Sequence, residues 1–148
     1  MSPAARKLFL AIAILAVLGI AVSSVSLDHH FRKSKTTYCD FGQSFNCDIV
    51  NRSEYSTIAG VPVALIGILG YAALLAFATF YRAKAETPGI LVIGSLGGLG
   101  FALYLTYIEK YVLFAWCILC LTSLAVIFSI TVLSVTLLTR SMRRLPTT

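Results

Sequence analysis

Four long apolar segments constrain the fold of this 148-residue chain more than any other feature. They cover residues 8–27, 60–81, 89–108 and 112–139. A helix needs about 20 apolar residues to cross a hydrocarbon core of about 30 Å, and each segment is about that long or longer. Because 58% of the residues are hydrophobic and only 12% are charged, the chain has too few polar side chains to cover a water-soluble globule.

Lipid offers no hydrogen-bond partner to an unpaired backbone group, so segments of this kind must cross it as helices. The sequence therefore predicts an all-α integral membrane protein, a bundle of four transmembrane helices that forms a single domain over residues 1–148. The first segment, preceded by Arg6 and Lys7, also has features of a cleavable signal peptide. Its apolar stretch is longer than the roughly 7–15 residues typical of such a peptide, so we expect a retained anchor helix.

Basic residues are distributed unequally between the two sides of the predicted bundle. One side carries Arg6, Lys7, Arg82, Lys84, Arg140, Arg143 and Arg144 against a single acid, Glu86. The other side, residues 28–59 and 109–111, has equal numbers of basic and acidic residues. Short loops rich in Lys and Arg are retained in the cytoplasm, so we expect both termini to be cytoplasmic and residues 28–59 to form an external loop. The net charge of +6 is then a topology signal and does not call for a nucleic-acid partner.

All four cysteines fall on the predicted external side. Cys39 and Cys47 lie in the external loop, whereas Cys117 and Cys120 form a Cys-x-x-Cys about one helical turn into the fourth apolar segment. Two structural disulfides are one interpretation, because disulfides persist in oxidising compartments. A bridge between residues three apart closes almost no chain, however, and adds little stability in the loop-closure model. A helix N-terminus favours thiolate, which suits redox chemistry.

Zinc binding is a third interpretation of a Cys-x-x-Cys. It would require a second such pair or suitably placed histidines, and the adjacent His29 and His30 are expected to be solvated at a helix end.

In the external loop, apolar residues alternate with charged ones over 45–58. This pattern predicts a short amphipathic helix or turn at the membrane interface that holds Cys47 close to Cys117. An ordinary loop with scattered apolar residues is the alternative.

The order and spacing of several motifs resemble the vitamin K epoxide reductase family. These motifs are Cys39-x7-Cys47, Ser53 six residues later, Gly60-Val61-Pro62 at the start of the second apolar segment, the run over 64–71, and Cys117-Ile118-Leu119-Cys120. The resemblance covers about residues 8–139. Quinone-linked four-helix oxidases of the DsbB type are the nearest alternative, but they carry their Cys-x-x-Cys in the first external loop, which is the reverse order.

The resemblance implies a quinone electron acceptor, such as ubiquinone, menaquinone or a vitamin K-like quinone, and no metal. The quinone would bind inside the four-helix bundle beside the Cys-x-x-Cys. Cys39 would exchange with a thioredoxin-like or DsbA-like partner, Cys47 would exchange with Cys117, and Cys120 would lie nearest the quinone. The implied activity is a membrane thiol-disulfide oxidoreductase that supports disulfide formation outside the cytoplasm, in a bacterial inner or plasma membrane.

Other positions are assigned less directly. Ser53 matches a family hydroxyl position near the relay, and Ser56 stands where the animal enzymes use an asparagine near the quinone. Trp116 adjoins the redox pair and is a candidate to line the quinone site. Leu124 replaces a tyrosine that the animal enzymes associate with the quinone, so we expect plain quinone reduction rather than epoxide reduction.

Many bacterial relatives carry a fused thioredoxin-like domain, whereas only nine residues follow the fourth apolar segment here, so the partner is expected to be a separate protein. Two other classes of function remain. One is a non-catalytic membrane protein with structural disulfides. The other is a small transporter or channel subunit, which would be expected to place ionisable groups inside its spans.

Overall fold

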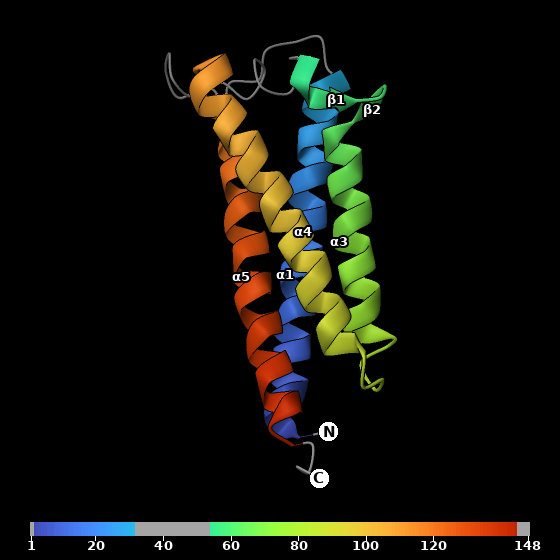
Figure 1. Cartoon of the computed structure of the whole chain (residues 1–148). Coiled ribbons are helices and arrows are strands. Elements are labelled where there is room, and N and C mark those ends of the chain that lie inside the picture. Colours follow the sequence, from blue (N-terminus) through green and yellow to red (C-terminus); the bar gives the residue numbers. More distant parts are fainter. Residues whose placement is uncertain (1, 32–53, 145–148) are drawn as a thin grey trace.

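Four helices lie side by side in the computed structural model, which describes residues 2–31 and 54–144 (Figure 1). They are α1 (Pro3–Phe31), α3 (Val63–Thr79), α4 (Thr87–Ile108) and α5 (Ile118–Met142). α1 begins and α5 ends at one end of the bundle, which we call the terminal end (Figure 1). The opposite end, where α5 begins, carries Cys117 and Cys120 and is called the cysteine end.

Three helical stretches are long and apolar enough to cross a membrane. They are Pro3–Phe31, Thr87–Leu113 and Ile118–Met142, and α3 is a shorter apolar helix of 17 residues. The prediction of long apolar helices is therefore confirmed for these three stretches. Whether α3 forms a fourth span is taken up with the proposed function.

A small hairpin that the sequence analysis did not predict precedes α3. A single 3-10 turn, η2 (Glu54–Ser56), leads into β1 (Thr57–Ile58), which pairs antiparallel with β2 (Val61–Pro62). The two residues between the strands, Ala59 and Gly60, both have positive φ, as a type I′ hairpin turn requires. The second apolar segment, expected from residue 60, therefore becomes helical only at Val63. The amphipathic helix or turn expected over residues 45–58 is described only from Glu54 onward, where the chain forms η2 and β1. Its earlier part lies outside the described residues.

The connection between α4 and α5 also differs from the expectation. One π-helical turn, η3 (Glu109–Leu113), continues α4, and Phe114 then adopts a left-handed conformation with φ 50° and ψ 29°. A left-handed residue ends a helix, so α5 starts at Ile118 rather than at residue 112. Cys117 is consequently the N-cap of α5 and does not lie one turn inside it. Hydropathy could not reveal this break, because residues 112–116 are all apolar.

The buried face of α1 organises the core. Its buried residues recur every three or four positions and thus lie on one side of the helix: Phe9, Ile12, Ala16, Gly19, Ser23, Ser26 and His29. This face packs against α3 and α5. Tyr71 and Leu74 of α3 and Ile127 and Ile130 of α5 complete the apolar core. Many other large apolar side chains are exposed, as expected of a bundle surrounded by lipid.

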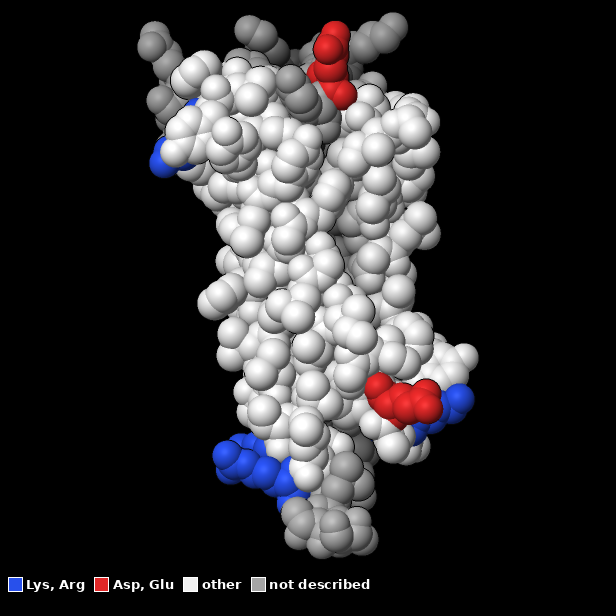
Figure 2. All heavy atoms as spheres, in the orientation of Figure 1, with Lys and Arg blue, Asp and Glu red and all other residues white. Residues whose placement is uncertain are grey.

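Charged side chains cluster near the two ends of the bundle. On the face shown in Figure 2, Lys, Arg, Asp and Glu lie near the ends, and the band between them is uncharged. Seven basic residues lie in the segments that form the terminal end: Arg6, Lys7, Arg82, Lys84, Arg140, Arg143 and Arg144. The seven basic residues from which a cytoplasmic side was predicted therefore lie at the same end of the bundle.

Candidate active site

A cavity of about 350 Å³ lies within the bundle toward its cysteine end. All four helices contribute to its walls, which are mainly apolar and include Val63, Ile66, Leu74, Phe101, Leu105 and Ile127. Gly70 and Gly97 leave space here, because a Cβ atom at either position would meet nothing within 4 Å. Pockets that bind small molecules commonly have volumes of about 300–1,000 Å³, so this one is large enough for a ligand.

The two described cysteines occupy different positions relative to the cavity. Cys120 lies in the first turn of α5, is partly exposed and lines the cavity. Cys117 is fully buried and is not among the described lining residues. The two side chains are hydrogen-bonded to each other. A ligand in the cavity would therefore meet Cys120, with Cys117 directly behind it.

The surroundings of Cys117 favour its thiolate. The pKa of the Cys117 thiol is lowered, chiefly because the Cys120 thiol donates a hydrogen bond to its sulfur. Backbone N–H groups of Leu119 and Cys120 act in the same direction, as expected at a helix N-terminus. Burial and the negative charge of Glu109 oppose the shift. A lowered pKa increases the fraction of thiolate, which is the form that takes part in disulfide exchange.

Glu109 is a site residue that the sequence analysis missed. It was counted as a loop charge, but η3 extends α4, and the side chain is only 1% exposed. The backbone N–H of Cys117 donates a hydrogen bond to its Oε2 at 3.1 Å. Glu109 also lines the cavity, together with Phe101 and Leu105 of α4. Its spacing from these two residues places it on the same side of a helix, and this was the available signal.

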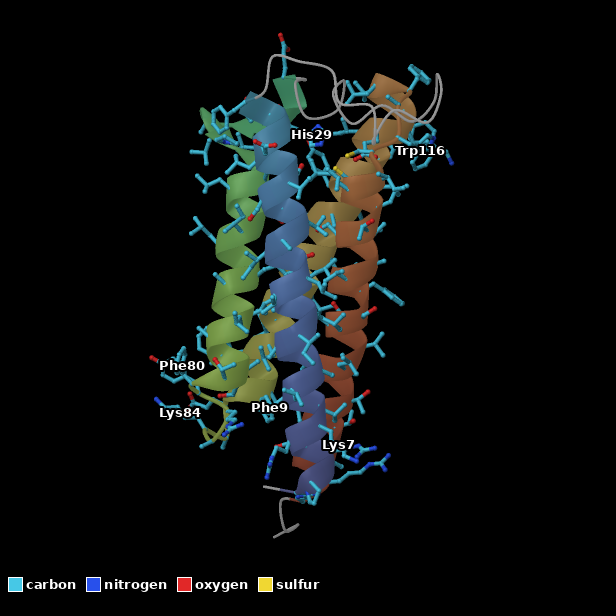
Figure 3. All side chains as sticks on the ribbon, turned by 180° about the vertical axis from the view of Figure 1, so that it is seen from behind. Lys7, Phe9, His29, Phe80, Lys84 and Trp116 are labelled. Atoms are coloured by element: carbon cyan, nitrogen blue, oxygen red, sulfur yellow. The ribbon has the colours of Figure 1, made fainter. Side chains whose placement is uncertain are left out.

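The two histidines at the end of α1 are not the solvated residues that the sequence suggested. His29 is fully buried, and Figure 3 shows it at the cysteine end of the bundle. His30 lines the cavity, where its Nδ1 shares a hydrogen bond of 3.3 Å with Ser56 Oγ. Ser56, a candidate for quinone binding, thus lines the cavity next to an imidazole. The three-residue spacing from Ser23 to Ser26 to His29 indicates this buried face.

A second polar pair lies farther along the cavity. The Tyr71 hydroxyl is 2.8 Å from Ser123 Oγ and donates a hydrogen bond to the Ser123 carbonyl oxygen at 3.0 Å. Both residues line the cavity. The sequence has Leu124 where the animal enzymes have a tyrosine. In this chain a phenol comes instead from Tyr71 of α3, which hydrogen-bonds Ser123, the residue just before Leu124. This contact joins α3 to α5 and could not be read from local spacing.

The remaining candidates lie elsewhere or outside the described residues. Trp116 is half-buried at the cysteine end (Figure 3) and is not among the described residues that line the cavity. Cys39, Cys47 and Ser53 fall within residues 32–53, outside the described part of the chain. Their approach to Cys117 therefore stays a prediction.

A bundle of apolar helices with one cysteine of a Cys-x-x-Cys pair at the wall of a ligand-sized cavity defines the class of protein. Residues 10–135 match the model of the Vitamin K epoxide reductase family, and the chain belongs to this family. The match covers most of the chain and confirms the resemblance noted in the sequence. A comparison with curated protein sequences found no match. Family membership indicates an oxidoreductase that acts in a membrane.

Proposed function

We propose that the protein passes electrons from a separate thioredoxin-like or DsbA-like partner, through Cys39 and Cys47, to Cys117 and Cys120, and then to a quinone. The observation that carries this proposal is the position of Cys120 at the wall of a mainly apolar cavity of about 350 Å³. A quinone ring is flat and apolar apart from its carbonyl oxygens. Such a molecule suits a cavity with apolar walls and a few polar groups.

The proposed reaction is a series of thiol-disulfide exchanges that ends in a two-electron reduction. A partner thiolate attacks Cys39 of a Cys39–Cys47 disulfide, and the released Cys47 thiolate attacks Cys117 of a Cys117–Cys120 disulfide. The partner's second thiol and Cys39 resolve the two mixed disulfides in turn, which leaves Cys117 and Cys120 reduced. The reduced pair then gives two electrons to the quinone, which takes up two protons and becomes the hydroquinone as the disulfide re-forms. The net product is an oxidised partner that introduces disulfides outside the cytoplasm.

The proposed topology has four spans with both termini in the cytoplasm of a bacterial cell, across its inner or plasma membrane. At about 1.5 Å per residue, the 17 residues of α3 rise about 26 Å, slightly less than a typical hydrocarbon core. A mismatch of a few ångströms is accommodated by local thinning of the bilayer. The concentration of basic residues at the terminal end supports this orientation, with the cysteine end outside.

Ser56 offers a test of quinone placement. If its hydroxyl contacts a quinone carbonyl, Ser56→Ala removes one hydrogen bond worth about 1 kcal/mol and should raise the KM for the quinone about fivefold. The kcat should change less than about twofold, because binding alone is affected. Thr57→Ala is the matched control, since the Thr57 hydroxyl hydrogen-bonds the Glu54 carbonyl oxygen and is not among the described lining residues. Equal KM values for the two variants would remove Ser56 from the quinone site.

The partner step can be tested by trapping. In the Cys47→Ala variant, Cys39 has no neighbouring thiol to displace a bound partner. Cys39 should attack a thioredoxin-like protein that keeps only its first active-site cysteine, activated as a mixed disulfide with a small thiol. The expected product is a covalent adduct that is visible on a non-reducing gel and is cleaved by a reductant. The Cys39→Ala, Cys47→Ala double variant is the control. An adduct of equal yield in this control, or none with Cys47→Ala, would refute the assigned entry point.

A further inference from the structure

Glu109 is the buried carboxylate of the described bundle. The other carboxylates in the described residues, Asp28, Glu54 and Glu86, are exposed, whereas Glu109 is 1% exposed. Its Oε2 accepts the Cys117 N–H, but its Oε1 is buried and has no hydrogen-bond partner in residues 2–31 and 54–144. Burying a carboxylate oxygen that accepts no hydrogen bond costs stability, so its retention calls for an explanation.

The position of Glu109 suggests what it does. It lines the same cavity as Cys120, and the Cys120 thiol lies near enough to interact with its carboxylate. The other titratable groups on the walls of this cavity come from α1, α3 and α5: His30, Tyr71 and Cys120. Glu109 contacts Cys117 through the Cys117 backbone N–H. Its neighbours Lys110 and Tyr111 are exposed. Glu109 is therefore a carboxylate placed between a redox thiol and the space where a ligand would bind.

We propose that Glu109 carries the proton of the Cys120 thiol to the quinone. Quinone reduction needs two protons as well as two electrons, and the apolar walls of the cavity supply few groups that can transfer them. Glu109 accepts the Cys120 proton as that sulfur forms a disulfide with Cys117, and it donates the proton to the nearer quinone oxygen. Because the site favours the Cys117 thiolate, the second quinone oxygen takes its proton from solvent. The carboxylate begins and ends the cycle ionised, and the electron pair passes from the two sulfurs to the quinone.

The inference rests on the proposed function, and Glu109→Gln tests it. A glutamine keeps an oxygen for the Cys117 N–H but cannot transfer a proton. Losing a general acid-base group typically costs about 10²–10⁴-fold, so kcat for quinone reduction should fall by that factor, with the KM for the quinone little changed. The pH profile of kcat should also lose one ionisation. Glu54→Gln, an exposed carboxylate at the same end, should retain wild-type kinetics, and Glu109→Asp should regain part of the rate and the missing ionisation.

A second measurement tests the role of Glu109 separately from the proposed quinone reduction. In a variant whose other three cysteines are changed to serine, the alkylation rate of Cys120 is followed against pH without any quinone. If Glu109 exchanges a proton with Cys120, the two titrate together, and Glu109→Gln should remove one inflection from this profile. Unchanged kcat and alkylation profiles in Glu109→Gln would overturn the role of Glu109. If the wild-type protein reduced no quinone while the single-cysteine variant showed the coupled alkylation profile, the quinone assignment would be overturned and the proton exchange would stand.

Discussion

Replacing Cys120 by alanine should lower quinone reduction by at least about 10³-fold, because the variant loses the thiol that lines the cavity and cannot form the Cys117–Cys120 disulfide. Two electrons cannot then leave the protein as a pair. Cys117 is buried and is not among the described residues that line the cavity. The effect should therefore fall on kcat, while the quinone still binds.

The measurement is steady-state quinone reduction by purified protein in detergent, with a dithiol donor. Thr122→Ala is a matched control, because Thr122 lies on the exposed side of the same helix and its hydroxyl hydrogen-bonds the Ile118 carbonyl oxygen. Thermal unfolding should be similar for both variants. A folded Cys120→Ala protein that turned over at the wild-type rate would exclude the assigned electron path.

The second large effect is expected on stability, at the contact between Gly19 and Tyr71. The Tyr71 ring packs directly on Gly19 of α1, and a Cβ atom at that position would overlap the ring. Gly19→Ala should displace the ring and weaken the hydrogen bonds between Tyr71 and Ser123. Overpacking of this kind costs about 1–3 kcal/mol, so the unfolding temperature should fall by several degrees.

A matched glycine controls for helix propensity. Gly100 of α4 is exposed, and a Cβ atom there would meet nothing within 4 Å. Gly100→Ala should therefore leave stability unchanged or increase it, because alanine favours helix over glycine by about 1 kcal/mol. Thermal unfolding in detergent compares the two variants. Equal unfolding temperatures would show that the Gly19 contact does not constrain the bundle.

The helices could be predicted from composition and hydropathy because lipid leaves the backbone few alternatives. The starts of α3 and α5 could not be predicted in this way. The type I′ turn at Ala59 and Gly60 and the left-handed Phe114 are decided by backbone geometry within apolar sequence, which a hydropathy pattern does not register. For the same reason Cys117 was expected inside a helix and is found at its N-cap.

The candidate site was predicted in part. The Cys-x-x-Cys motif singled out Cys120, and the resemblance to the animal enzymes singled out Ser56. Both line the cavity, and their contact with a quinone stays a prediction. Glu109 was missed because a charged residue near a span end is ordinarily a loop residue, whereas here a π-helical turn continues α4 through it. The Tyr71–Ser123 pair joins residues far apart in sequence, so it depends on how α3 and α5 pack. Contacts between helices of this kind leave no local signal.

The most direct test of the account uses the protein with Cys39 and Cys47 both changed to serine, so that Cys117 and Cys120 are its remaining thiols. The variant is fully reduced, freed of reductant and mixed without oxygen with a short-chain ubiquinone or menaquinone. Absorbance and thiol titration follow one turnover. We predict that each protein reduces one quinone and loses both thiols to a Cys117–Cys120 disulfide. Quinones that stay oxidised beside two intact thiols would contradict the central claim.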